Sequence, residues 1–181
     1  QVCKTLPRWD IEGIPMIPIS VNFAGSTLRQ ESIAEKMLFL IEKYHVYCEY
    51  LEVEVSESYT DMNQEMLTET SGKIRKANVR VILDHFGAKN SSFSILSIME
   101  FDGLKLDKSL ITNMVGNSRS RMVAKAVIDI CRQLGSYVLA SGVETQDQLN
   151  VLQELGCDYA QGTLFNKPIT IETFEVRYLK E

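Results

Sequence analysis

Polar side chains that could bind a metal ion or move a proton follow short apolar stretches of this sequence. The clearest case is the apolar run at 81–83, which ends in Asp84 and His85, with Gly87 close behind. Consecutive apolar residues over this length predict a strand that is buried on both faces. Parallel α/β folds place their chemistry at the carboxyl ends of such strands, so Asp84 is a candidate site residue.

The same arrangement recurs at five other short apolar stretches. Their polar residues are Asn22, Glu54 followed by Glu57, Lys105 followed by Asp107, Ser141 followed by Glu144, and Gln161. Helical patterns separate most of these stretches. The alternation predicts an α/β fold, a TIM-barrel-like (β/α) barrel, in which several strand ends assemble one site.

Each of these residues also has a purely structural explanation. An acid after an apolar strand is more often a helix cap or a turn residue than a functional group. Asn22 alone fits an Asx turn, and Glu144 alone fits the N-terminus of a helix. Lys105 fits a solvated strand end, and Gln161 fits an ordinary loop. The repetition at one end of six strands is what favours a functional site.

The spacing of apolar residues predicts the helices between these strands. Helices are expected at residues 2–12, although Pro7 disturbs that pattern, and over 27–44, 62–76 and 118–134, with a short one after 93. Gly135 suits the position just after the fourth of these helices. A capping-box pattern at 145–148 predicts another helix, which ends at Gly156. No linker or repeat is evident, so residues 1–181 are expected to form one domain.

Length and composition indicate a soluble globular protein. The chain has 181 residues, of which 45% are hydrophobic and 24% charged, and its net charge is −5. The acidic balance argues against binding to a nucleic-acid polymer or an anionic membrane surface. No apolar run reaches the roughly 18 residues of a membrane span. The four cysteines form no C-x-x-C pair, and Cys131 fits an apolar helix face, so a cytoplasmic location is expected.

Five motifs of this chain together resemble the EAL domain family, phosphodiesterases that hydrolyse cyclic di-GMP. The motifs are Ile19-Ser20-Val21-Asn22, Leu51-Glu52-Val53-Glu54 with Glu57, Leu83-Asp84-His85-Phe86-Gly87, Leu104-Lys105-Leu106-Asp107, and Gly142-Val143-Glu144-Thr145 followed by Gln161-Gly162. Each motif is weak alone, but their order and separations suit the family across nearly the whole chain. The resemblance implies a TIM-barrel-like fold of the EAL type.

The resemblance also implies roles for individual residues. Phosphodiester hydrolysis needs an activated water and neutralised phosphate charge, which two Mg²⁺ or Mn²⁺ ions supply in such a site. The corresponding residues are Asn22, Glu54 and Asp84 as metal ligands, Lys105 and Glu144 as catalytic residues, and Gln161, Glu57 and Asp107 as residues that support the site and its ligand.

Three departures from the family pattern weaken the expected metal site. His85 stands where the family has a second aspartate, and a neutral imidazole is a poorer Mg²⁺ ligand that brings no negative charge. Ser141 replaces a glutamate, and a hydroxyl cannot bind metal or orient water as a carboxylate does. Lys89 stands in a loop position where the family has glycine. Any Mg²⁺ or Mn²⁺ is therefore expected to bind weakly.

The first two strands of the family barrel, with the glutamate of the name-giving motif, have no counterpart in these residues. An eight-stranded barrel takes about 250 residues. Six strands would leave two unpaired sheet edges. A truncated chain, a chain that lacks its N-terminal part, and edge pairing between two protomers are the competing explanations. Exposed edges make a homodimer or another protein partner plausible.

The sequence therefore predicts a degenerate EAL-type domain of bacterial cyclic di-GMP signalling. It would be a non-catalytic module that acts through protein contacts or binds cyclic di-GMP without cleaving it. The alternative is an active metal-dependent phosphodiesterase that hydrolyses cyclic di-GMP to the linear dinucleotide pGpG.

Overall fold

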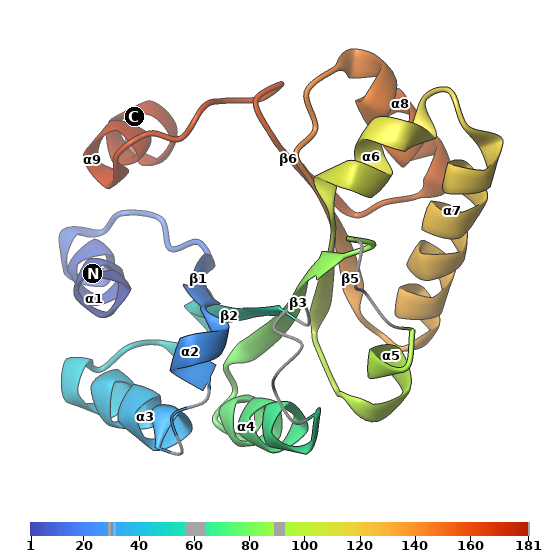
Figure 1. Cartoon of the computed structure of the whole chain (residues 1–181). Helices are drawn as coiled ribbons and strands as arrows, with labels where there is room; N and C mark the ends of the chain where they lie inside the picture. Colours follow the sequence, from blue (N-terminus) through green and yellow to red (C-terminus); the bar gives the residue numbers. More distant parts are fainter. Residues whose placement is uncertain (29, 31, 57–63, 89–92, 181) are drawn as a thin grey trace.

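Six parallel strands form the centre of the computed structural model, which describes residues 1–28, 30, 32–56, 64–88 and 93–180. The strands are β1 (Ile19–Phe23), β2 (Leu51–Ser56), β3 (Arg80–Phe86), β4 (Gly103–Leu106), β5 (Tyr137–Ser141) and β6 (Tyr159–Gln161). Each strand pairs with the next, so β1 and β6 are the edges of one sheet. The sheet curls into half a barrel with helices along its outer side (Figure 1), and the predicted TIM-barrel-like α/β fold is confirmed.

Helices precede, connect and follow the strands. They are α1 (Val2–Glu12), α2 (Gly25–Leu28), α3 (Ile33–Tyr44), α4 (Gln64–Lys76), α5 (Ile95–Ile98), α6 (Lys108–Met114), α7 (Ser118–Gln133), α8 (Gln146–Leu155) and α9 (Ile171–Phe174), with a 3₁₀ turn, η1 (Cys48–Tyr50), and a π-helical turn, η2 (Glu175–Leu179). Across the described part of the chain, no helix combines the length and the apolar character that crossing a membrane requires.

The helix signals in the sequence agree with the structure in most places. Thr145 and Gln148 form the predicted capping box, and Gly156 ends α8 in the left-handed region at φ +78°. The single helix predicted over 27–44 is wrong, because the chain forms α2 and then α3. The polar residues between them offer no apolar side chain to continue the buried stripe of α3.

The core lies between the convex face of the sheet and the helices. Apolar residues such as Val53 and Leu104 alternate with polar residues along the strands and belong to one buried cluster with side chains of α3, α6 and α7. Cys131 of α7 is fully buried, and burial raises the pKa of its thiol to about 12. The prediction that Cys131 is a core thiol is therefore confirmed.

Glu175 joins the first helix of the chain to its last helical turn. Trp9 Nε1 donates to Glu175 Oε1 at 2.8 Å, and Arg8 Nη1 donates to Oε2 at 3.3 Å. Lys180 Nζ lies 3.5 Å from the same Oε2. The hydrogen bonds from Arg8 and Trp9 lower the pKa of this carboxyl to about 2, although its burial opposes them. The two ends of the half-barrel are thus held together in the helical layer.

Replacing Glu175 with glutamine is expected to lower the melting temperature by several degrees at neutral pH, because Arg8 and Trp9 lose an anionic acceptor. The wild-type carboxylate contributes its full stability above its ordinary pKa of 4.5, and this contribution is lost as the pH falls through about 2. Differential scanning calorimetry should therefore show the gap between wild type and Glu175→Gln closing over this pH range. Glu172→Gln, on exposed α9, is the control. Equal losses in both variants would contradict the role of Glu175.

Candidate functional site

Lys105 lies at the centre of the candidate site, between two buried carboxylates. Its Nζ is 2.7 Å from Glu54 Oε2 and 3.8 Å from Asp84 Oδ1. None of the three side chains is more than 10% exposed. They come from β4, β2 and β3, so the structure brings together three of the predicted site residues from neighbouring strands.

A bulge at the end of β3 turns His85 toward two carboxylates. The pairing of β3 with β4 shifts register between Leu83 and Phe86, and His85 adopts a left-handed φ of +61°. Its Nε2 is 3.3 Å from Asp84 Oδ2, and its Nδ1 is 3.1 Å from Asp107 Oδ2. The backbone N–H of His85 also donates to Asp84 Oδ1 at 2.8 Å. The imidazole therefore links the end of β3 to the start of α6.

Asp107 caps the helix that follows β4. Its Oδ1 accepts the Ser109 backbone N–H at 2.8 Å at the N-terminus of α6. Burial alone would raise the pKa of the Asp107 carboxyl, but hydrogen bonds from Ser109 and His85 hold the pKa below its ordinary value. Asp107 thus has the capping role that a strand-end acid commonly has, while its predicted role toward a ligand stays a prediction.

Glu144 forms a second, more exposed charge pair. Lys108 Nζ lies 2.6 Å from Glu144 Oε1, and the two side chains are 56% and 44% exposed. Lys108 belongs to α6, so this pair ties the loop after β5 to the helix capped by Asp107. Lys108 could not be singled out from the sequence, because a lysine in the first turn of a helix is an ordinary surface residue. The catalytic role of Glu144 stays a prediction.

Gln161 lies at the edge of a cavity at the end of β6. Its backbone carbonyl accepts the N–H groups of Gly142 and Val143 at 2.8 and 2.9 Å. Gln161 lines a cavity of about 660 Å³ together with Ser141 and aromatic residues that include Phe165. The structure therefore places Gln161 beside Ser141, at the same end of the sheet as the Lys105 site.

Asn22 is exposed on the edge strand β1, where it pairs in register with Glu54 of β2. Glu57 lies outside the described residues, as does Lys89.

The structure adds one buried carboxylate, that of Glu52, which was not predicted from the sequence. Glu52 accepts a hydrogen bond from Ser20 Oγ at 2.8 Å and lies 3.1 Å from Arg80 Nη1. The sequence feature that could have revealed Glu52 is its position two residues before Glu54, which places both acids on the same face of β2.

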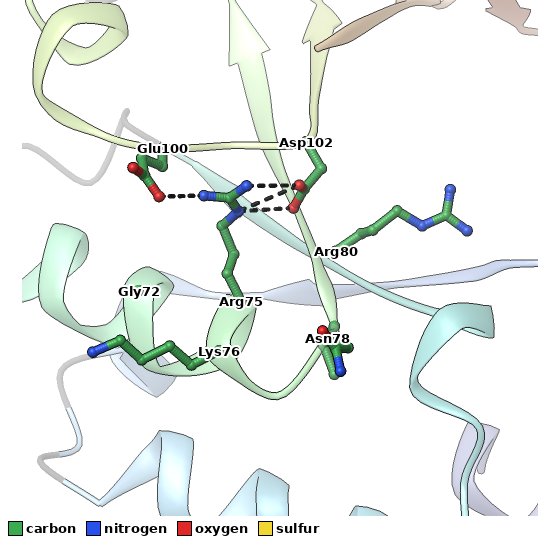
Figure 2. A pocket seen from close by; sticks show the side chains of 8 residues that line it. Gly72, Arg75, Lys76, Asn78, Arg80, Glu100 and Asp102 are labelled. Carbon is green, nitrogen blue, oxygen red and sulfur yellow. Dashed lines mark hydrogen bonds and ion pairs between the residues drawn. The ribbon is translucent and has the colours of Figure 1, made fainter. Parts of the chain in front are cut away.

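A polar pocket of about 480 Å³ lies at the opposite ends of β3 and β4 (Figure 2). Arg75 donates from Nη2 to Asp102 Oδ1 at 3.0 Å and from Nη1 to Glu100 Oε2 at 2.5 Å. Asp102 also accepts the backbone N–H of Val81 at 2.8 Å. These charges satisfy one another and fix the starts of two strands, so the pocket has a structural role.

The carboxylates near Lys105 do not fit a divalent metal as they are placed. Within residues 1–28, 30, 32–56, 64–88 and 93–180, no three His, Cys, Asp or Glu side chains cluster closely enough to hold a metal ion. Glu54 bonds the ammonium group of Lys105, and both oxygens of Asp84 face His85. Mg²⁺ and Mn²⁺ require oxygen ligands, and a nearby ammonium group repels them. No reaction step through a metal follows from this arrangement.

Comparison with known proteins identifies the family. The family model for the EAL domain matches residues 1–168. The chain belongs to the EAL domain family. As an EAL domain it is 31% identical over 97% of its length to the signaling protein YkoW of Bacillus subtilis, and 29% identical over 97% to the cyclic di-GMP phosphodiesterase NbdA of Pseudomonas aeruginosa. The crystal structure of the EAL domain of Mycobacterium smegmatis DcpA matches 97% of the chain with a TM-score of 0.88 at 26% identity.

The EAL domain corresponds to only part of each of these proteins. It covers 22% of the length of YkoW and 22% of that of NbdA, and 79% of the DcpA chain. The similarity therefore establishes the family of this chain. The activities of the longer proteins do not transfer directly to this chain.

Gly162, directly after Gln161, leaves no room for a side chain. A Cβ atom there would lie 2.0 Å from the carbonyl oxygen of Val143 and 2.4 Å from its nitrogen. Gly162→Ala is therefore expected to lower the free energy of unfolding by about 1–3 kcal/mol or more, measured by urea denaturation. Gly116→Ala is the matched control, because a Cβ at Gly116 would meet nothing within 4 Å. Equal stability of the two variants would contradict the close approach of β6 to the loop after β5.

Proposed function

We propose that this EAL domain is a non-catalytic module of cyclic di-GMP signalling, which senses the ligand or passes a signal through protein contacts. The observation that carries the proposal is the engagement of Glu54 and Asp84 by the protein's own donors, Lys105 and His85. Carboxylate oxygens that already accept these hydrogen bonds are less available to a divalent metal. Loss of a metal-activated water would remove most of the hydrolysis rate.

Two side chains at the site support the same proposal. His85 brings no carboxylate to the end of β3, and both its ring nitrogens face carboxylates of the protein. Ser141 presents a hydroxyl at the end of β5, beside the cavity that Gln161 lines. Fewer negative ligands weaken the binding of Mg²⁺ or Mn²⁺, commonly by about 10–100-fold for each lost supporting group.

Cyclic di-GMP is the ligand that the family suggests for this module. The cavity of about 660 Å³ beside Gln161 is of the size that binds small molecules, and it combines polar groups with aromatic side chains. We further propose that residues 1–181 act as one domain in the cytoplasm, and that signal output passes through a homodimer or another protein partner.

The second candidate function is an active phosphodiesterase that converts cyclic di-GMP to pGpG with Mg²⁺ or Mn²⁺. It is favoured by the similarity to NbdA, a cyclic di-GMP phosphodiesterase. It is also favoured by five residues at positions that match the family motifs: Asn22, Glu54, Asp84, Lys105 and Glu144. In that case Asn22, Glu54 and Asp84 would hold the metal, after Lys105 and His85 had moved away from the carboxylates.

The purified chain is expected to release no pGpG from cyclic di-GMP in the presence of Mn²⁺, because Glu54 and Asp84 are engaged. The measurement is chromatography of the reaction, with isothermal titration calorimetry on the same samples. Binding without product would identify a ligand sensor. A folded chain that neither binds nor cleaves would indicate protein contacts as the route of signalling. Metal-dependent product would refute the non-catalytic proposal and establish the phosphodiesterase.

The double variant His85→Asp, Ser141→Glu is expected to bind Mn²⁺ at least about tenfold more tightly than the wild type, because it restores two carboxylates. Calorimetric titration with Mn²⁺ measures the change. His45→Asp is a suitable control, since His45 is also an exposed histidine in the left-handed region, at φ +51°, but lies at the end of α3. Unchanged Mn²⁺ affinity in the double variant would show that these two side chains do not limit metal binding.

A further inference from the structure

A second polar layer lies on the concave face of the sheet, nearer the N-terminal ends of the strands than the Lys105 site. Ser20, Glu52 and Arg80 stand opposite one another in register on β1, β2 and β3. Glu52 is 8% exposed, and its two carboxylate oxygens contact Ser20 and Arg80. Glu54 follows it on the same face, about 6.6 Å further along the strand. β2 therefore presents two buried carboxylates, and the ammonium group of Lys105 lies on Glu54.

The ring of Tyr137 occupies the space that a side chain at Gly103 would fill. Tyr137 of β5 stands in register with Gly103 of β4. A Cβ atom at Gly103 would lie 2.4 Å from Tyr137 Cζ and 2.6 Å from Cε2, so the ring lies across the bare backbone of β4. Tyr159 of β6 packs edge to face against the same ring, with the ring centroids 5.3 Å apart. The ring is therefore held between its neighbours on both sides.

The phenol group of Tyr137 reaches toward the carboxylate of Glu52. Burial raises the pKa of Tyr137, and the negative charge of Glu52 raises it further, while the charge of Arg80 lowers it. Lys105 follows Gly103 by two residues, so both project from the same face of β4. The ring thus fills the space that the Lys105 side chain would need in order to turn toward Glu52.

We propose that Tyr137 is a positioning residue, whose ring directs the ammonium group of Lys105 to Glu54 and away from Glu52. Arg80 already balances the charge of Glu52, so Glu54 is the carboxylate of β2 that has room for a further cation. The inference deepens the proposed function and rests on it, because an ammonium group held on Glu54 keeps a divalent metal from that carboxylate.

The test is a double-mutant cycle, which separates the coupling free energy of two side chains from the overall stability of the fold. Lys105→Met is combined with Glu54→Gln or with Glu52→Gln, and urea denaturation measures the unfolding of each variant. In a Tyr137→Ala background, the coupling of Lys105 to Glu54 is expected to fall to less than half, and a coupling to Glu52 should appear. Tyr47→Ala, which removes an exposed tyrosine ring beside η1, is the matched control and should leave both couplings unchanged.

A rescue variant tests the position of the ring. Adding Gly103→Phe to Tyr137→Ala returns a ring to the same space from β4, and it should restore the coupling of Lys105 to Glu54. Tyr137→Phe keeps the ring and should preserve that coupling. If the variants of the cycle do not fold, calorimetric titration of Tyr137→Ala with Mn²⁺ decides, and the affinity is expected to rise at least about tenfold over the wild type.

A coupling that moves from Glu54 to Glu52, or the rise in Mn²⁺ affinity, would support the role of Tyr137. The role is refuted if the coupling to Glu54 is unchanged, falls without a new coupling to Glu52, or falls equally in Tyr47→Ala. Unchanged Mn²⁺ affinity in the second measurement would also refute it. None of these readouts involves cyclic di-GMP or pGpG. Release of pGpG by the wild-type chain would therefore refute the proposed function, while an unmoved coupling would refute only the role of Tyr137.

Discussion

The buried ion pair between Lys105 and Glu54 is the constraint on which the site depends. These residues lie on β4 and β2, and the pair reaches across β3 on the concave face of the sheet. Strands that are next-but-one neighbours in a flat sheet are about 9.5 Å apart, so curling of the sheet favours a contact of 2.7 Å. Removing one partner from such a buried pair commonly costs about 3–5 kcal/mol. The pair therefore couples the charge of the site to the curvature of the half-barrel.

The same pairing explains how an EAL domain can keep the family's strand-end residues and still present an unsuitable site for a metal. Parallel strands bring acids to one end of the sheet, where their mutual repulsion needs compensation. Lys105 and the donors of His85 provide that compensation inside the protein. Asp107 and Glu144 are engaged in turn by Ser109 and Lys108, around α6. The described acids of the site are thus drawn into contacts within the protein, and these contacts are the basis of the proposed non-catalytic role.

Local patterns in the sequence predicted the strands, the capping box of α8 and the buried Cys131, because each depends on residues close in the chain. The split between α2 and α3 was missed because the prediction extended the apolar spacing of α3 back across the polar residues that precede it. The bulge that turns His85 toward Asp107 and the contact between Trp9 and Glu175 could not be predicted, since both depend on residues that only tertiary packing brings together. For the site, the order of the motifs indicated which strand ends lie together. The ion-pair partner of each charged side chain could not be predicted, because it depends on the three-dimensional structure.

The contact of Glu175 with Arg8 and Trp9 also places the first and last helical segments side by side. The order of the strands from β1 to β6 does not depend on this contact, because each strand pairs with the next. A rotation applied to α1 would therefore reach η2 directly, without passing through the sheet.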